Sequence, residues 1–338
     1  MLKLIRKALL VGLGSIGLRH LRLLREALPE ADIRVLRHTK TVEEKNRESD
    51  GFFFRLEDAC SFAPELAVIA NPSPFHIVTA MALAEAGAHL LVEKPLSPLS
   101  DGAEDLISLC ASRKQVLYVG YNLRFLETLC SFREALASGC IGEIHSVHSA
   151  VGQFLPQWRP GSDYRKTVSA QKELGGGVLL ELSHDIDMLR WIFGDVEWVS
   201  AWLGRKGNLD IDVEDNAVLQ MNFKSGPIAH LSLDFLRHDT TRVCTAIGAD
   251  GSLSWDAIKG SVSIFRRDKP SWELLKSHDT DRDSTYRAQL EAFLNEIKGE
   301  RSDFAARGID GLEVINLIEA ARLSDAQNGK RIVPRVVQ

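Results

Sequence analysis

Three glycines at fixed spacing, Gly12, Gly14 and Gly17, stand between a short apolar run and an amphipathic segment near the start of the chain. The run 8–11 is typical of a buried strand, and the apolar residues after Gly14 are spaced for one face of a helix. In this setting Gly-x-Gly-x-x-Gly indicates dinucleotide binding, because the glycines permit a tight turn and a close approach of backbone to a pyrophosphate. We therefore expect cofactor contacts from Gly12, Gly14, Ser15, Ile16 and Gly17.

Strand-like and helix-like segments alternate through the first third of the chain. Strands are expected at 8–11, 33–37, 66–70, 90–92 and 116–119, with helices at 75–86 and 101–112. Strand and helix in turn, with short connections, predict a doubly wound parallel sheet. Because 338 residues exceed the roughly 250 to 300 at which one core stops growing, we expect two domains, 1–122 and 123–338.

The second part of the chain is rich in strands. They are expected at 143–151, 196–203, 216–223, 228–235, 243–247, 252–256 and 262–266. Tight turns such as 224–227 join neighbours, so this sheet should be largely antiparallel. Helices must cover one of its faces, and the other is expected to pair with a second subunit, in a homodimer or homotetramer. The predicted fold class is α/β: an N-terminal Rossmann doubly wound parallel sheet plus a C-terminal α/β domain with a large, mostly antiparallel open sheet.

Charge and cysteine usage narrow the class of protein. The net charge is −5 and no basic block is present, which gives no reason to expect a nucleic acid or a membrane as partner. The five cysteines are odd in number and scattered, without a Cys-x-x-Cys motif. This usage indicates reduced thiols in a cytoplasmic enzyme, with neither a disulfide framework nor a metal site.

Lys94 occupies a special place in the predicted parallel sheet. The apolar run 90–92 ends at two charges and a proline, Glu93-Lys94-Pro95. Lys94 therefore lies at the carboxyl edge of the sheet, where open α/β sheets bind their ligands. The alternative is a solvated lysine in a turn.

Two further loops are expected at this edge. In the first, residues 71–76, prolines fix the backbone, and Asn71, Pro72 and His76 are candidates to meet the nicotinamide ribose. His76 could equally be an ordinary histidine in the first turn of a helix. The second loop, residues 121–125, carries Tyr121, Asn122 and Arg124 and crosses into the second domain.

The end of the second strand bears on the choice of cofactor. An Asp or Glu usually stands there when the ligand is NAD, because a carboxylate binds the ribose 2′-hydroxyl. This chain has Arg37 and His38 instead. Since a cation suits a 2′-phosphate, the sequence predicts NADP in preference to NAD; the alternative is a surface arginine.

A helix in the second half carries a candidate proton-transfer group. It follows Gly175-Gly176-Gly177 and brings Leu180, His184 and Asp187 to one face, with Glu181 beside His184 one turn earlier. A histidine next to carboxylates can move a proton near neutral pH. The alternative is a satisfied histidine of the core, but the glycines allow a ligand to approach the backbone closely.

Residues 153–166 are too rich in proline, glycine and aromatic residues for regular structure. Trp158, Arg159 and Tyr164 are candidate substrate-binding residues, because aromatic faces and charged groups bind polyhydroxylated rings and anions. The alternative is a structural loop wrapped on the core.

Taken together, these motifs resemble the glucose-fructose oxidoreductase and inositol dehydrogenase family (Gfo/Idh/MocA) over essentially the whole chain. The resemblance is carried by the glycine motif with Arg19-His20, Asn71-Pro72-x-x-x-His76, Glu93-Lys94-Pro95, Gly120-Tyr121-Asn122-x-Arg124-Phe125, and the Gly-Gly-Gly to His-Asp-x-Asp helix. It implies an NAD(P)-dependent oxidoreductase that transfers hydride between the nicotinamide and a hydroxyl-bearing carbon of a sugar, sugar derivative or sugar nucleotide. It further implies that Lys94 and His184 bracket the reacting hydroxyl, and that Glu93 and Asn122 join the cofactor site.

One position departs from the family pattern. The carboxylate that usually lies four residues before the histidine is replaced by Leu180, whereas Glu181 lies three before. Either Glu181 substitutes, or the relay is His184 with Asp185 or Asp187. Two other functions stay open: a non-catalytic NAD(P)-binding sensor, and a redox-cycling sugar-modifying enzyme with tightly bound cofactor.

Overall fold

The computed structural model describes residues 5–38, 48–279, 281 and 283–336. It divides into two compact units, the first of Met1–Asn122 with Arg282–Ile315 and the second of Leu123–Asp281 with Asn316–Gln338. The sequence predicts that all residues after 122 belong to the second domain. Residues 283–315 lie in the first unit instead, because helix α8 (Ser284–Ile297) packs against helix α1 (Ser15–Ala27).

The first unit contains a six-stranded parallel sheet in the order β3-β2-β1-β4-β5-β6. Its strands are β1 (Lys7–Val11), β2 (Asp32–Leu36), β3 (Gly51–Phe53), β4 (Leu66–Ile69), β5 (His89–Val92) and β6 (Leu117–Val119). Because strand order reverses between β1 and β4, the carboxyl edge there is a topological switch point, the usual ligand position in such sheets.

Helices complete the first unit. Besides α1 and α8 they are α2 (Leu56–Ser61), α3 (His76–Glu85), α4 (Ala103–Ser112) and the first part of α9 (Gly308–Ala326), with a 3-10 turn at Ser73–Phe75. A second 3-10 turn, Asn122–Phe125, spans the boundary to the second unit. Residues of β1, β4 and β5 are almost wholly buried, as expected for strands covered on both faces.

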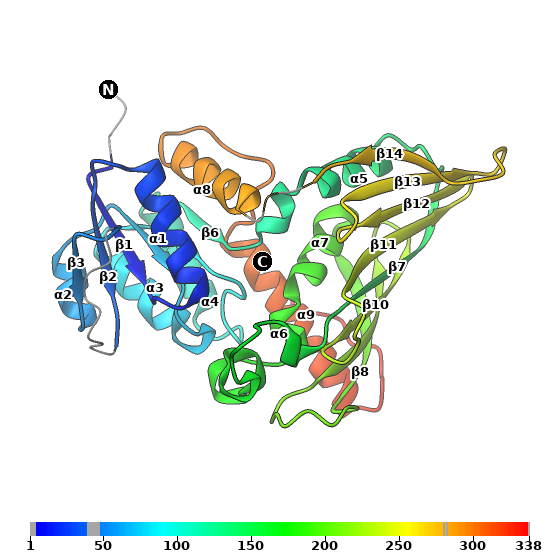
Figure 1. Ribbon diagram of the computed structural model, residues 1–338. Coiled ribbons are helices and arrows are strands. Elements are labelled where there is room, and N and C mark those ends of the chain that lie inside the picture. The colour runs from blue at the N-terminus through cyan, green and yellow to red at the C-terminus, as the bar shows by residue number, and fades with distance from the viewer. Residues whose placement is uncertain (1–4, 39–47, 280, 282, 337–338) are drawn as a thin grey trace. The chain divides into compact units, whose positions relative to one another are not determined.

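The second unit contains an eight-stranded sheet in the order β14-β13-β12-β11-β7-β10-β9-β8, which Figure 1 shows side by side. The strands are β7 (Ile144–Gly152), β8 (Val196–Gly204), β9 (Asn216–Phe223), β10 (Ile228–Asp234), β11 (Thr241–Gly248), β12 (Gly251–Asp256), β13 (Ser261–Arg266) and β14 (Glu273–Ser277). All neighbours pair antiparallel except β10 and β7, which are parallel.

Helices cover one face of this sheet. Helix α5 (Glu127–Ala137) packs on β12, β13 and β14, and α6 (Val178–Glu181), which leads into α7 (Ser183–Phe193), packs on β9 and β10. The opposite face carries the exposed side chains of Trp202, Ile228 and Ile247. It also carries the rings of His148 and His230, stacked with their centroids 5.0 Å apart.

The predicted fold class is therefore confirmed: a doubly wound parallel sheet and a larger, mostly antiparallel open sheet. In the part of the chain that the structure describes, no helix combines the length and apolarity needed to cross a bilayer. The five cysteines are all among the described residues and are free thiols.

Candidate active site

The glycine motif forms the turn between β1 and α1. Gly12 has φ +87°, and a Cβ there would lie 2.7 Å from the carbonyl oxygen of Ala70. A Cβ on Gly17 would lie 2.3 Å from the carbonyl oxygen of Gly12. Both positions therefore require glycine for packing and backbone geometry.

Gly14 differs from the other two glycines because a Cβ there would meet nothing within 4 Å. It is the N-cap of α1, and no side chain caps the amides that follow, those of Ser15 and Ile16. Open space beside the uncapped amides of a 13-residue helix suits a pyrophosphate. The residues present at this turn fit a dinucleotide cofactor.

Arg37 and His38 follow β2 directly, as the sequence predicts. The Arg37 amide donates to the carbonyl of Phe53, and its guanidinium carbon lies 6.0 Å from the centre of the Phe52 ring. The His38 ring lies 6.4 Å from that of Phe75, an exposed residue of the loop after β4. A guanidinium and three aromatic rings thus lie near the end of β2.

The loop after β4 contains Asn71, Pro72 and His76. His76 is buried, with Nε2 2.7 Å from the carbonyl oxygen of Asn71 and Nδ1 2.9 Å from that of Pro95. Burial lowers the pKa of His76, although the two carbonyls oppose this effect. Both ring nitrogens of His76 therefore contact backbone carbonyl groups, one in the loop after β4 and one in the loop after β5. His76 holds these two loops together, and neither nitrogen is left to contact a ligand.

The loop after β5 places Lys94 at the carboxyl edge of the sheet. Glu93 is buried, its Oε1 lies 2.7 Å from Nε2 of His20, and its Oε2 accepts a hydrogen bond from the Lys94 amide. Burial opposes ionisation of Glu93, but His20 and the charge of Lys94 outweigh it and hold the pKa of Glu93 below its ordinary value. Glu93 therefore fixes the backbone from which Lys94 projects.

Tyr121 and Asn122 end the first of the two chain segments that form the first unit. Both are buried, and Nδ2 of Asn122 donates to Oγ1 of Thr285 at 2.7 Å. This bond ties the last strand of the sheet to α8, which sequence reasoning assigned to the other domain. A single sequence gives no signal for such a pair, 163 positions apart.

In the second unit, the helix that carries His184 is interrupted. The sequence predicts one helix after the glycine triplet, but the structure breaks it at Leu182 into α6 and α7. Glu181 ends α6 and His184 lies in the first turn of α7; both are partly exposed. The predicted single helical face through Leu180, His184 and Asp187 is therefore wrong.

The two aspartates after His184 have partners of their own. Arg124 donates from Nε and Nη2 to the two carboxylate oxygens of Asp187, at 2.9 and 2.6 Å, and both residues are buried. Asp185 lies 3.2 Å from Nη2 of Arg242, and burial raises the pKa of Asp185 despite this cation. Two of the three carboxylates considered for the relay, Asp185 and Asp187, therefore contact arginines.

Sequence reasoning missed Glu214. Its carboxylate lies against Gly177, where a Cβ would be 2.4 Å from Oε1, and it accepts a hydrogen bond from the Leu179 amide. Burial raises the pKa of Glu214. A glutamate in an irregular segment carries no pattern that distinguishes it from a solvated one.

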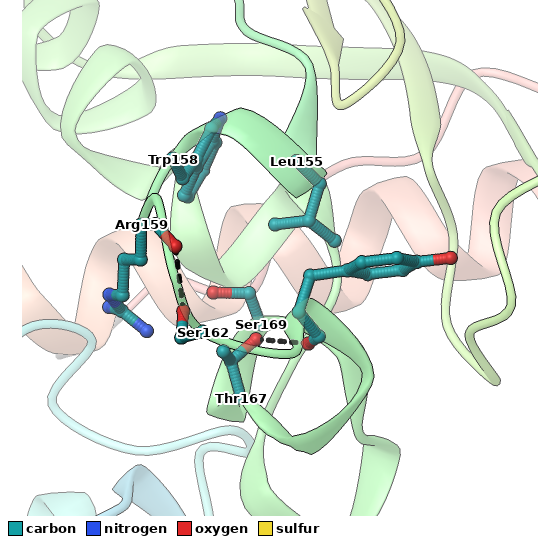
Figure 2. Close-up of a pocket in the computed structure, with 7 residues that line it drawn as sticks. Leu155, Trp158, Arg159, Ser162, Thr167 and Ser169 are labelled. Carbon is teal, nitrogen blue, oxygen red and sulfur yellow. Dashed lines mark hydrogen bonds between the residues drawn. The ribbon is translucent and has the colours of Figure 1, made fainter.

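Residues 153–174 form a loop with short 3-10 turns, at Leu155–Gln157, Tyr164–Lys166, Val168–Ala170 and Lys172–Leu174. The candidates Trp158, Arg159 and Tyr164 line one small hollow in it (Figure 2). Ser162, Thr167 and Ser169 add hydroxyl groups to the same hollow. The loop is thus folded around a small pocket within the second unit, lined by apolar surface and a few polar groups.

Models of one protein family match both halves of the chain. The model described as "Oxidoreductase family, NAD-binding Rossmann fold" matches residues 6–121. The model described as "Oxidoreductase family, C-terminal alpha/beta domain" matches residues 133–333.

Individual relatives extend over most of the chain. Myo-inositol 2-dehydrogenase of Thermotoga maritima is 26% identical, over 93% of this chain and 94% of the relative. D-glucoside 3-dehydrogenase of Escherichia coli is 23% identical, over 80% of this chain and 79% of the relative. Levoglucosan dehydrogenase, solved in complex with NADH, has 20% identity and a TM-score of 0.86, with 98% of this chain and 100% of that chain covered.

Proposed function

The chain belongs to the Gfo/Idh/MocA oxidoreductase family, and we propose that it transfers hydride between a nicotinamide cofactor and a hydroxyl-bearing carbon of a sugar, sugar derivative or sugar nucleotide. Its first unit is an NAD-binding Rossmann domain. Myo-inositol 2-dehydrogenase and D-glucoside 3-dehydrogenase, two of its relatives, are named for polyol and sugar oxidation, which supports this class of substrate.

One observation carries the proposal. Lys94 follows β5 at the same carboxyl sheet edge at which the Gly14 turn follows β1, because both strands belong to one parallel sheet. A buried carboxylate holds the Lys94 backbone. A lysine whose backbone is held at the sheet edge of a dinucleotide turn is suited to bring an amine to a substrate oxygen and polarise it.

The roles of the chain's residues follow from this placement. Gly12, Gly14, Ser15, Ile16 and Gly17 hold the pyrophosphate. Asn71, Pro72 and Asn122 shape the edge for the nicotinamide ribose, while His76 and Glu93 fix the loops. When bound, the cofactor supplies the hydride acceptor or donor.

When hydride leaves the substrate carbon, the hydroxyl group on that carbon must lose its proton to a base. His184 takes the proton of the substrate hydroxyl, and Lys94 stabilises the oxygen from which it leaves. Glu181 supports His184 from the end of α6, three positions before it in the chain. Tyr121, Arg124 and Asp187 complete the substrate site, the last two by holding its wall together as a pair.

Two finer proposals concern the cofactor and the assembly. Arg37 and His38 favour NADP over NAD, because these residues, and no carboxylate, directly follow β2.

The open face of the second sheet, with Trp202, Ile228 and Ile247 exposed, joins a second copy of the chain in a homodimer or homotetramer. The free thiols are consistent with work in the reducing cytoplasm.

The experiment that tests the function is a substrate screen. The purified protein is mixed with NAD or NADP and a panel of sugars, polyols and nucleotide sugars, while the nicotinamide absorbance is followed. We expect reduction with at least one sugar, and no reduction by Lys94→Ala at the same concentrations. A wild-type protein that binds NADH but oxidises no member of the panel, and reduces no matching ketone, would contradict the proposal.

A further inference from the structure

The hollow in the loop 153–174 has two polar groups whose bonding capacity the described residues leave unused. The hollow is lined by Leu155, Trp158, Arg159, Ser162, Tyr164, Thr167 and Ser169. Most of its polar atoms are engaged within the loop itself: Nε1 of Trp158 donates to the carbonyl of Gln153, and Oγ1 of Thr167 donates to that of Tyr164. Arg159 and Ser169 are the exceptions.

Arg159 is a cation without a counter-ion. Its guanidinium forms no ion pair with any residue within the described ranges. Arg165, six positions later in the same loop, contrasts with it, because it donates from Nε and Nη2 to the two oxygens of Asp163, each at 2.9 Å. The two arginines share a loop and are both exposed, so only their pairing differs.

Ser169 supplies the second group. Its side chain is 1% exposed, and its hydroxyl has no hydrogen-bond partner among the described residues. A buried hydroxyl without a partner costs free energy, so such a group signals a ligand. Figure 2 shows this hydroxyl directed toward the side of the hollow where Arg159 and Ser162 lie.

The hollow is connected to the helices that carry the proposed base. The carbonyl of Ser169 accepts a hydrogen bond from the Gly177 amide at 3.1 Å, and a Cβ on Gly176 would lie 2.7 Å from the same oxygen. Gly177 is the N-cap of α6. The loop therefore packs directly on the turn that leads to Glu181 and His184.

The size of the hollow limits what enters it. Its cavity volume of about 10 Å³ accepts one water-sized group and not a sugar ring. An oxygen of a carboxylate or phosphate has this size, and it would accept from both a guanidinium and a hydroxyl.

We propose that Arg159 and Ser169 form a specificity subsite for an anionic group, carboxylate or phosphate, carried by the sugar substrate. The subsite rests on the proposed function, because it assumes a sugar bound beside α6. It narrows the class of substrate to acidic sugars, which Arg159 selects over neutral sugars.

The test compares three ligands that differ in one substituent: D-glucose, D-glucuronate and D-glucose 6-phosphate. Dissociation constants are measured by calorimetry with the NADH-saturated protein at low ionic strength. We expect at least one of the two acids to bind about 10 to 100 times more tightly than glucose, and Arg159→Gln to remove this preference while leaving glucose unchanged. Ser169→Ala should weaken the binding of the same acid by a smaller factor.

Arg165→Gln is the matched control, since it removes a cation from the same loop that already has a carboxylate partner. It should leave the preference for the acid intact. Preference for glucuronate alone identifies a carboxylate site, and preference for the phosphate ester alone identifies a phosphate site. Equal binding of all three ligands, or equal effects of Arg159→Gln and Arg165→Gln, would overturn the proposal.

Failure of the subsite and failure of the function give different results. If the sugar panel shows nicotinamide reduction but no acid is preferred, the dehydrogenase activity is supported and the anion subsite is contradicted. If the acid binds through Arg159 but no sugar is oxidised, the anion subsite is supported and the dehydrogenase activity is contradicted.

Discussion

Nε2 of His20, on α1, lies 2.7 Å from Oε1 of Glu93, at the end of β5, and both side chains are buried. The pair joins the helix that begins at the cofactor turn to the loop that carries Lys94. The other carboxylate oxygen of Glu93 accepts a hydrogen bond from the Lys94 amide. A single carboxylate therefore connects the helix that follows the glycine turn to the loop that carries Lys94.

The first prediction follows from the low pKa of Glu93. A carboxyl whose folded pKa lies below its unfolded value, ordinarily 4.5, stabilises the fold above that value and loses this contribution as the pH falls. Glu93→Gln should therefore lower the free energy of unfolding by about 1–2 kcal/mol at pH 7, with a shrinking difference below pH 4.5. Urea unfolding of the wild type and the variant, at pH 7 and at a pH below 4.5, measures this difference in the free energy of unfolding.

Glu57→Gln serves as the control for this experiment, because Glu57 is exposed and pairs only at the surface with Arg55. It should change the unfolding midpoint little at either pH. A deficit of Glu93→Gln that stays constant with pH would show that the ionised carboxylate is not the stabilising form.

The second prediction separates two glycines of the same motif. Gly17→Ala should destabilise the fold by about 1–3 kcal/mol, because its Cβ would stand 2.3 Å from a backbone oxygen. Gly14→Ala meets nothing within 4 Å and should keep the wild-type Tm, yet weaken NADH binding about tenfold or more, since the methyl group occupies the pyrophosphate's approach. Thermal unfolding and NADH fluorescence titration distinguish these effects. An unchanged NADH affinity in Gly14→Ala would place the cofactor elsewhere.

The nucleotide edge illustrates how far the sequence alone could lead. The glycine turn, the position of Lys94 after a strand and the alternation of strands and helices depend on local patterns, namely apolar runs of three to five residues and glycines at fixed spacing. They were predictable for that reason. The pairs His20 with Glu93 and Arg124 with Asp187 join residues 73 and 63 positions apart, and no periodicity in one chain reveals them.

Short and polar elements escaped prediction for a different reason. Strand β3 has three residues, too few to show a pattern, and the edge strand β14 is mostly exposed, with two adjacent leucines and no alternation of apolar and polar residues. The amphipathic pattern of α8 shows that one face is buried but not against which unit. The break at Leu182 has no signal in the sequence, since residues 178–191 keep helical spacing across it.

The third prediction concerns the buried ion pair of the second unit. Asp187→Asn removes one charge and leaves Arg124 buried beside Trp191, so it should cost about 3–5 kcal/mol in urea unfolding. The double variant Arg124→Met/Asp187→Leu should cost less than the sum of its single variants, because no unpaired charge remains. Additive losses would contradict a direct coupling between the two side chains.

The fourth prediction addresses cofactor choice. Arg37→Ala should weaken NADPH binding about tenfold and leave NADH nearly unchanged, because only the 2′-phosphate needs the cation. Arg34→Ala is the control, since Arg34 lies within β2, pairs with Asp32 and packs on Phe62. It should not alter the ratio of the two affinities. Equal losses for both cofactors in Arg37→Ala would exclude a phosphate contact.

We propose above that Lys94 and His184 act on one substrate hydroxyl. The most direct test of this proposal is the turnover rate of Lys94→Ala, His184→Ala and the double variant on the best sugar of the screen, with NADH binding as the control for folding. We predict a loss of about 100-fold or more for each single variant and a double-variant loss well below the product of the two, since residues that act as a unit are not additive. Near wild-type rates in both single variants, with NADH binding intact, would contradict the account.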